Sequence, residues 1–174
     1  MTDNFTEQFH NCKIIFKKDA LNDLHDELKK ISAKKIFLII GKKSAGESGL
    51  LERTKKNLKD FEVVEFNNTS SKPTLDIIKE CVSAIKENNC QAVIGLGGGN
   101  VMDIAKSAAA FAKSGPDEIL KNIFSNEKVF CATIPTIAGT GAEITPFAVF
   151  YNNDQKYSLD NPKVQPNLAI VDPA

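Results

Sequence analysis

The sequence predicts an α/β fold, in which an open and mainly parallel β-sheet carries helices on both faces. Two observations predict it. Four strongly apolar runs of the β type occur along the chain, and helical patterns of about 10–15 residues separate them. A third observation is the size: 174 residues, 42% of them hydrophobic and 25% charged, suit one domain with its own core. We therefore expect residues 1–174 to form a single domain.

The first half of the chain supplies two helices and two strands. Residues Ala20–Lys30 are predicted to be helical with Asp19 as N-cap, because four apolar side chains repeat on one face: Leu21, Leu24, Leu28 and Ile31. The continuous apolar run Ile36–Ile40 is typical of a buried strand. A helix is predicted over Leu50–Lys59. The alternating run Phe61–Phe66 indicates a strand nearer an edge of the sheet.

The second half repeats this alternation. The polar segment Asn67–Pro73 is predicted to be a loop, and Thr74–Asn88 a helix. A strand over Ala92–Leu96, a helix over Val101–Lys113 and a strand over Val129–Ile134 follow. Strands separated by helices form βαβ units, and these build a parallel sheet that is covered on both faces.

The pattern changes after Pro146. Three short strand-like runs follow, separated by turn sequences that contain Asn, Asp and Pro: Phe147–Phe150, Lys156–Leu159 and Leu168–Val171. The chain stops shortly after the last run without a terminating helix or a polar tail. We take this ending as an indication of truncation.

Charge and cysteine usage narrow the class of protein. The chain carries 22 basic and 22 acidic residues, with 16 basic and 14 acidic in residues 1–90. A nucleic-acid or membrane-surface protein needs a basic excess, so neither partner is expected. The four cysteines have no metal-site spacing, and neither a signal peptide nor a membrane-spanning run is present. A cytoplasmic location with reduced thiols is the expectation.

The strongest local signal is a glycine-rich loop, Gly95–Lys106 (GLGGGNVMDIAK), which follows a predicted strand and opens a predicted helix. Consecutive glycines let the backbone approach a ligand, and the N-terminus of the helix favours an anion such as a pyrophosphate. The G-x-G-x-x-G fingerprint fails at Asn100. A purely structural alternative remains: Asn100 would cap the helix, with Asp103 in a capping-box position.

A second loop of small residues follows the next strand. Residues Ile134–Pro146 (IPTIAGTGAEITP) contain three threonines, whose hydroxyls both donate and accept hydrogen bonds. Two such loops after neighbouring strands mark the edge where an open α/β sheet binds its ligand. The alternative is that they are ordinary turns, with Glu143 as an exposed charge at the start of a helix.

Catalytic and metal-binding groups are not visible. Gly41-Lys42-Lys43-Ser44 is not a P-loop, because the motif requires glycine at position 36, which is Ile36. His10 and His25 are the only histidines, and they form no pair with metal-ligand spacing. We expect a nucleotide site without catalytic residues and without a metal site.

At these loops the sequence resembles the N-terminal domain of the iron-dependent (group III) alcohol dehydrogenases. The segments Gly97–Lys106, Ile134–Val149 and Asn167–Pro173 carry the resemblance, in the same order and spacing. It implies a Rossmann-like, dehydroquinate synthase-like domain that binds a dinucleotide. The stretch Gly139–Val149 favours the alcohol dehydrogenase branch over glycerol dehydrogenase and dehydroquinate synthase.

The resemblance also implies roles for individual residues. The pyrophosphate would lie against Gly97, Gly98, Gly99 and Asn100, with Asp103 bracing the loop. Adenosine and nicotinamide-side contacts would come from Thr136, Gly139, Thr140 and Thr145. Cofactor-lining and ribose contacts would come from Phe147, Val149 and Lys156. The sequence departs from the family in having Asn100 and Ala142 where serine is frequent, and Ile137 where threonine is frequent.

A further departure concerns the choice of cofactor. Many NAD-using members carry aspartate where this chain has Lys42, and that aspartate binds the 2′-hydroxyl of the adenosine ribose. Gly41, Lys42 and Ser44 offer a positive charge and a hydroxyl instead, which suits a 2′-phosphate. NADP(H) is therefore predicted over NAD(H). The alternative is that the lysines are simply solvated.

Taken together, the resemblance predicts the cofactor-binding half of a metal-dependent alcohol dehydrogenase that acts on a small primary alcohol or its aldehyde. The divalent metal, usually iron, would belong to a C-terminal helical domain absent from this chain, so the chain alone should be inactive. A homodimer is possible. Two alternatives stay open: a stand-alone nucleotide-binding or regulatory module, and an interaction fragment whose first strand pairs with a neighbour.

Overall fold

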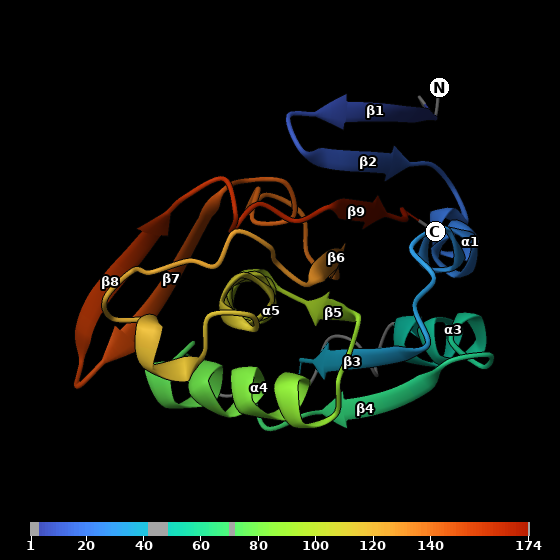
Figure 1. Ribbon diagram of the computed structural model, residues 1–174. Coiled ribbons are helices and arrows are strands. Elements are labelled where there is room, and N and C mark those ends of the chain that lie inside the picture. The colour runs from blue at the N-terminus through green and yellow to red at the C-terminus, as the bar shows by residue number, and fades with distance from the viewer. Residues whose placement is uncertain (1–3, 42–48, 70–71, 174) are drawn as a thin grey trace.

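The computed structural model describes residues 4–41, 49–69 and 72–173. Its main sheet has seven strands in the order β1-β2-β9-β6-β5-β3-β4, and a separate sheet has two, β7 and β8. Every neighbouring pair in the main sheet is parallel except β1 with β2. The predicted α/β class, with an open and mainly parallel sheet, is confirmed (Figure 1).

The four predicted strands form the centre and one edge of this sheet. They are β3 (Lys35–Ile40), β4 (Glu62–Phe66), β5 (Ala92–Gly97) and β6 (Phe130–Pro135). All residues of β5 are buried, as are five of the six residues of β3, whereas β4 is partly exposed. The continuous apolar runs therefore lie inside the sheet, and the alternating run forms its edge, as their patterns predict.

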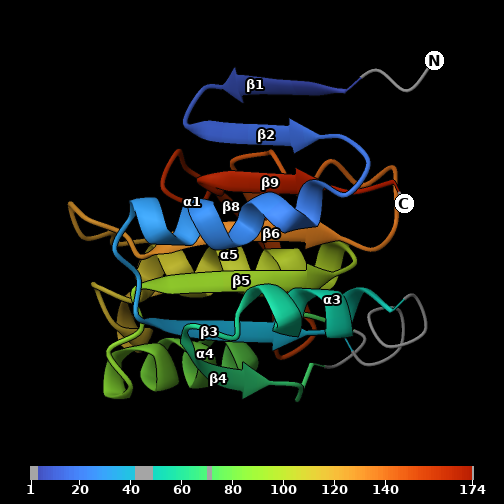
Figure 2. The same ribbon diagram turned by 90° about the vertical axis from the view of Figure 1, so that its right-hand side faces the viewer.

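Helices cover both faces of the sheet. The short 3-10 helix η1 (Ala20–Asp23), α1 (Leu24–Lys30) and α3 (Leu50–Asn57) pack on one face, which is seen in Figure 2. On the other face lie α4 (Leu75–Glu87), α5 (Gly99–Phe111) and the 3-10 helix η2 (Pro116–Glu118). Two hydrophobic clusters, one on each face, make up the core.

The first two strands are a finding that the sequence analysis did not anticipate. β1 (Phe5–Phe9) and β2 (Cys12–Phe16) form a hairpin, and β2 then pairs in parallel with β9 (Leu168–Val171). Every residue of β1 is exposed, so this segment lacks the apolar pattern of a buried strand. Pairing with β2 decides its structure instead.

Three local predictions are wrong. Asp19 does not cap the first helix: it adopts a left-handed conformation (φ 59°), and its side chain forms no capping hydrogen bond. Ile31 does not lie on the buried face but stays 37% exposed at the end of α1. Residues 142–144 form a turn, so Glu143 is not at the start of a helix. For Asp19 a tertiary contact outweighs the local pattern, because its amide donates to the carboxylate of Asp172.

The segment after β6 leaves the main sheet and then returns to it. β7 (Phe147–Asn152) and β8 (Gln155–Asp160) pair in an antiparallel fashion, and β7 packs beside α5 and α4. The chain then re-enters the main sheet as β9, between β2 and β6. β7 therefore packs against α4 and α5 instead of joining the main sheet, and it bonds to Asp103 and Lys106 of α5.

Candidate functional site

The glycine loop lies where the sheet changes direction. From β3 the chain passes through α3 to β4 at one edge, whereas from β5 it passes through α5 to β6 on the other side. The carboxyl ends of β3 and β5 therefore flank a topological switch point, the usual ligand position in an open α/β sheet. Gly41 directly follows β3 there, and its amide donates to the carbonyl of Leu96 at 3.0 Å.

Close packing explains part of the glycine content. A Cβ on Gly95 would lie 2.7 Å from the Cβ of Ala105, and one on Gly97 would lie 2.7 Å from the side chain of Val101. These two glycines let α5 approach β5. At Gly98 a Cβ would meet only Ile137, at 3.7 Å, so space remains above this residue.

The helix begins two residues earlier than the capping interpretation requires. Gly98 is the N-cap of α5, and Asn100 lies inside the first turn rather than capping it. Asp103 forms no capping box either, because it lies beyond the N3 position of this helix, and its carboxylate instead accepts the amide of Val149 at 3.2 Å. The structural alternative for Asn100 and Asp103 is therefore wrong, and the exposed Asn100 faces outwards beside the glycines.

The two predicted loops come together at this edge. The amide of Thr136 donates to the carbonyl of Gly97 at 3.0 Å. A Cβ on Gly99 would lie 3.4 Å from the Cγ2 of Thr140. The second loop is shaped by two glycines with positive φ, Gly139 (99°) and Gly141 (65°). Small residues on both loops therefore border one open space beside the positive end of the α5 dipole.

The remaining predicted residues follow the second loop in the sequence, at its end and on β7 and β8. Thr145 ends the second loop, and its amide donates to Gly141 at 3.2 Å. Phe147 and Val149 are on β7, with Phe147 47% exposed. Lys156 is an exposed residue of β8 and pairs with Tyr151. Tyr151 in turn bonds to Pro73 at the start of α4, so Lys156 also lies towards the carboxyl edge of the sheet. The predicted contacts of Lys42 and Ser44 fall outside the described residues.

Lys106 has a clear place beside the site, although the sequence analysis assigns it no role. Lys106 is the last residue of the glycine-rich motif, and its side chain is fully buried. Its ammonium contacts the carboxylate of Asp103 and the carbonyls of Thr145 and Phe147. The signal in the sequence was a lysine within the apolar stretch Val101–Ala112.

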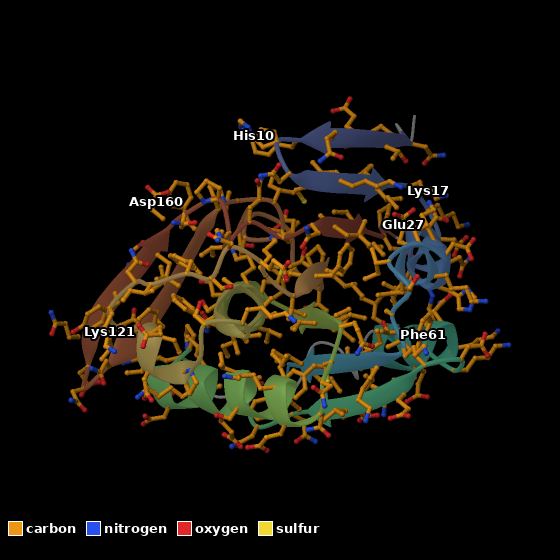
Figure 3. All side chains as sticks on the ribbon, viewed as in Figure 1. His10, Lys17, Glu27, Phe61, Lys121 and Asp160 are labelled. Carbon is orange, nitrogen blue, oxygen red and sulfur yellow. The ribbon has the colours of Figure 1, made fainter. Side chains whose placement is uncertain are left out.

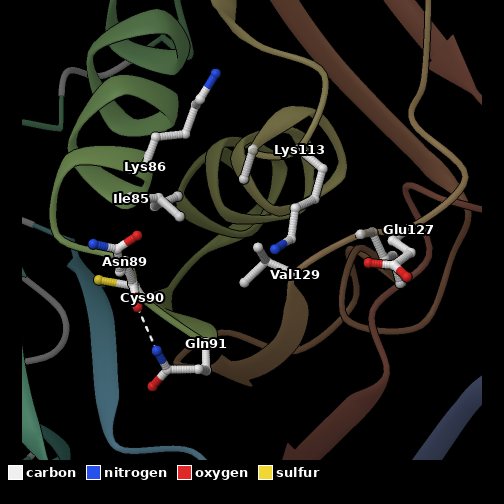
Figure 4. Close-up of a pocket in the computed structure, with 10 residues that line it drawn as sticks. Ile85, Lys86, Asn89, Cys90, Gln91, Lys113, Glu127 and Val129 are labelled. Carbon is white, nitrogen blue, oxygen red and sulfur yellow. Dashed lines mark hydrogen bonds between the residues drawn. The ribbon is translucent and has the colours of Figure 1, made fainter.

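Hollows on the surface occur at both edges of the sheet. A cavity of about 620 Å³ borders the second loop and includes Thr136, Ile137 and Gly139, together with apolar residues of β1 and β2. A cavity of about 540 Å³ lies at the opposite edge, where α4 and α5 end (Figure 4). Its lysines Lys86 and Lys113 lie near the C-terminal ends of these helices, where the helix dipole favours cations. This second cavity is therefore not the candidate site.

Neither histidine lies at the candidate site. Figure 3 places His10 at the turn between β1 and β2, and His25 on α1 contacts Asp26 and Asp60. In the part of the chain that the structure describes, no group of three His, Cys, Asp or Glu side chains could hold a metal ion. Among the same residues, no helix is long and apolar enough to cross a bilayer.

The fold and the site thus define an open α/β domain with a ligand position built from two small-residue loops at the carboxyl edge. The family model described as iron-containing alcohol dehydrogenase matches residues 11–173. The chain therefore belongs to the iron-containing alcohol dehydrogenase family. Its relatives are oxidoreductases, as the resemblance implies.

Individual relatives agree with this assignment. The NAD-dependent methanol dehydrogenase of Bacillus methanolicus is 32% identical over 166 residues, which cover 91% of this chain and 43% of the relative. The NADH-dependent butanol dehydrogenase B of Clostridium acetobutylicum is 30% identical over 168 residues, or 92% and 43% of the two chains.

A solved structure shows the same arrangement. The NADH-dependent butanol dehydrogenase A from Thermotoga maritima superposes with a TM-score of 0.86 at 28% identity, covering 99% of this chain and 45% of that one. The chain therefore spans less than half the length of the relatives that it matches.

Proposed function

We propose that this chain is the dinucleotide-binding domain of a metal-dependent alcohol dehydrogenase, which transfers hydride between a small primary alcohol or its aldehyde and a nicotinamide cofactor. One observation carries the proposal. Loops after the neighbouring strands β5 and β6 meet at the switch point, joined by the hydrogen bond from Thr136 to Gly97. The space above Gly98 and the N-terminus of α5 suit a pyrophosphate.

The residues divide by the part of the cofactor that they would contact. Gly97, Gly98, Gly99 and Asn100 would contact the pyrophosphate. The adenosine and nicotinamide sides of the pyrophosphate would be contacted by Gly41, Thr136, Gly139, Thr140 and Thr145. The nicotinamide end would be contacted by Phe147, Val149 and Lys156. When bound, the nicotinamide accepts or donates the hydride. The part played by this chain is to hold and orient it.

The names of the relatives guide the choice of substrate class. The relatives cited above are named as methanol and butanol dehydrogenases. We propose a short primary alcohol for this chain's own enzyme. The described residues offer no site for the family's metal, so we propose that its ligands lie outside this chain and that the isolated chain is inactive.

For the cofactor we propose NADP(H) over NAD(H), on the basis of Lys42 and Ser44. These residues follow Gly41, whose own position beside Gly97 supports a place near the adenosine ribose. The relatives cited are named NAD- or NADH-dependent, so this preference would distinguish the present chain from them. Lys42→Asp is expected to reverse it, and an unchanged ratio of NADPH to NADH affinity would contradict it.

The test of the main proposal is a titration of the purified chain with NADPH and with NADH, followed by nicotinamide fluorescence. Saturable binding that ADP displaces is expected, without alcohol oxidation even after ferrous ion is added. Circular dichroism would establish that the chain is folded. A folded chain that binds neither nucleotide would contradict the proposal, and turnover by the chain alone would contradict the placement of the metal ligands elsewhere.

Two further proposals concern the protein as a whole. The exposed edge strand β1 supports a homodimer, because an unpaired strand edge can pair with a second copy. Sedimentation at several concentrations would test this. The four cysteines are all buried and free, which supports a reducing, cytoplasmic location.

A further inference from the structure

A buried ion pair on α5 holds the segment that follows the second loop. The side chain of Lys106 is fully buried, and that of Asp103 is 16% exposed. The Lys106 ammonium lies 3.4 Å from an oxygen of Asp103. Burying a lysine costs considerable free energy unless its charge and its hydrogen-bonding capacity are satisfied. Such a residue therefore needs an explanation beyond filling the core.

The partners of the pair supply that explanation. Lys106 donates to the carbonyls of Thr145, at 3.4 Å, and Phe147. The second oxygen of Asp103 accepts the amide of Val149 at 3.2 Å. Two side chains of α5 thus form hydrogen bonds with the backbone of residues 145, 147 and 149, which all face the helix from the same edge of their segment. On its other edge β7 pairs with β8, so the ion pair takes the place of a neighbouring strand.

The same helix also fixes the glycine loop. α5 begins at Gly99, and its N-cap is Gly98. Asp103 lies about one turn further along and Lys106 nearly a turn beyond that. Because an α-helix is rigid over this length, the ion pair sets the position of residues 145–149 relative to Gly97–Gly99. These two segments are the proposed contacts for the nicotinamide end and the pyrophosphate.

The charges of the pair are mutually dependent. Burial lowers the pKa of Lys106, and the neighbouring Asp103 carboxylate opposes that shift. Burial raises the pKa of Asp103, and Lys106 opposes that shift as well. Removing either charge leaves the other buried without its counter-ion.

We propose that Asp103 and Lys106 are a positioning pair: they set the distance between the pyrophosphate loop and the nicotinamide-binding segment, and thereby select the whole dinucleotide over its adenosine half. This inference rests on the proposed function. It assigns no chemical step to either residue. It predicts instead that the loss of the pair weakens binding of the nicotinamide half specifically.

The test compares NADH with ADP in folded variants of the 174-residue chain. Lys106→Met keeps the unbranched chain up to the ε position and removes the charged ammonium. We expect it to weaken NADH at least tenfold and ADP less than threefold, because ADP reaches only the adenosine and pyrophosphate contacts. Lys113→Met, which removes an exposed lysine just beyond α5, is the matched control and should change neither affinity.

Asp103→Asn is the second variant, and it serves if Lys106→Met does not fold. It should show the same selective loss of NADH, and adding it to a folded Lys106→Met chain should cause little further loss. Equal weakening of NADH and ADP would overturn the proposal in favour of general structural support. Unchanged NADH affinity in a folded variant would overturn it too. An unmodified chain that binds neither nucleotide would instead refute the proposed function itself.

Discussion

At the scale of single residues, the glycines of the β5–α5 connection serve two different purposes. Gly95 lies beneath α5, where a methyl group would collide with Ala105. Gly98 has an extended backbone (φ −81°, ψ −175°) that any residue can adopt, and a methyl group there meets only ordinary contact. Packing therefore requires Gly95, whereas the proposed ligand requires Gly98.

This difference predicts opposite behaviour for two alanine substitutions. Gly95→Ala should lower the free energy of unfolding by about 2 kcal/mol, because the core has no room for a further methyl group. Gly98→Ala should lower it by less than about 1 kcal/mol, because alanine is a poorer N-cap than glycine. It should weaken dinucleotide binding about tenfold, since its methyl group would occupy the space proposed for the pyrophosphate. Urea unfolding and nicotinamide fluorescence measure the two effects. A Gly98→Ala chain with full affinity would argue against a pyrophosphate above this residue.

At the scale of the elements, α1 is tied to β2 by a shared carboxylate. Glu27 of α1 lies 2.7 Å from the ammonium of Lys13 on β2 and 2.6 Å from that of Lys30. Its side chain is only 13% exposed. Burial raises the pKa of Glu27, but hydrogen bonds from the two lysines outweigh it, so the net pKa is lowered.

A lowered pKa makes this contribution dependent on pH. The carboxylate stabilises the fold fully above its unfolded pKa, about 4.3, and the stabilisation disappears as the pH falls through the lower folded value. Glu27→Gln should therefore destabilise the chain by about 1 kcal/mol at pH 7 and by progressively less below pH 4. Urea unfolding across this range measures the difference. The exposed Glu80→Gln on α4 is the control, and a pH-independent difference would contradict the assignment.

The start of α4 depends on one hydroxyl. Thr74 is the N-cap, and its side-chain oxygen accepts the amide of Ile77 at 3.4 Å. Thr74→Ala should cost about 1 kcal/mol of unfolding free energy, whereas Thr74→Ser, which keeps the hydroxyl, should cost much less. Chemical denaturation separates the two variants. Equal losses would show that the methyl group of Thr74, rather than its cap, supports the helix.

At the scale of the whole molecule, a contact joins distant parts of the chain beside β9. Asp172 follows β9, and its side chain is 1% exposed. It accepts the backbone amides of Asp19, at 3.0 Å, and Leu21, at 3.3 Å, and pairs with Arg53 of α3 at 2.7 Å. One carboxylate thus links the last strand to η1 and α3.

We predict that Asp172→Asn lowers the free energy of unfolding by about 2 kcal/mol, because a charged and buried acceptor of hydrogen bonds from Asp19, Leu21 and Arg53 becomes neutral. Combining it with Arg53→Met in a double-mutant cycle should give a coupling of at least about 1 kcal/mol. Equilibrium unfolding in urea provides all four values. Strictly additive losses would mean that the amides of Asp19 and Leu21, and not Arg53, account for the effect.

The elements that are predictable from the sequence are those in which the local apolar pattern agrees with burial in the fold. The apolar runs became β3, β5 and β6, and the alternating run became the edge strand β4. The helix predicted over Thr74–Asn88 became α4, with Thr74 as its N-cap and Asn88 as its C-cap. The glycine-rich and threonine-rich loops were recognised as neighbours because the ends of parallel strands share one edge of the sheet.

Tertiary structure alone decided the features that depend on partners distant in sequence. β1 has no buried face, and its pairing with β2 fixes it. Asp19 does not cap the helix, and its backbone amide donates to the carboxylate of Asp172. Asp103 and Lys106 bond to β7, more than 35 residues away. Local propensity cannot predict such contacts, because the free energy of burying a charge depends on the partners that the complete fold brings to it.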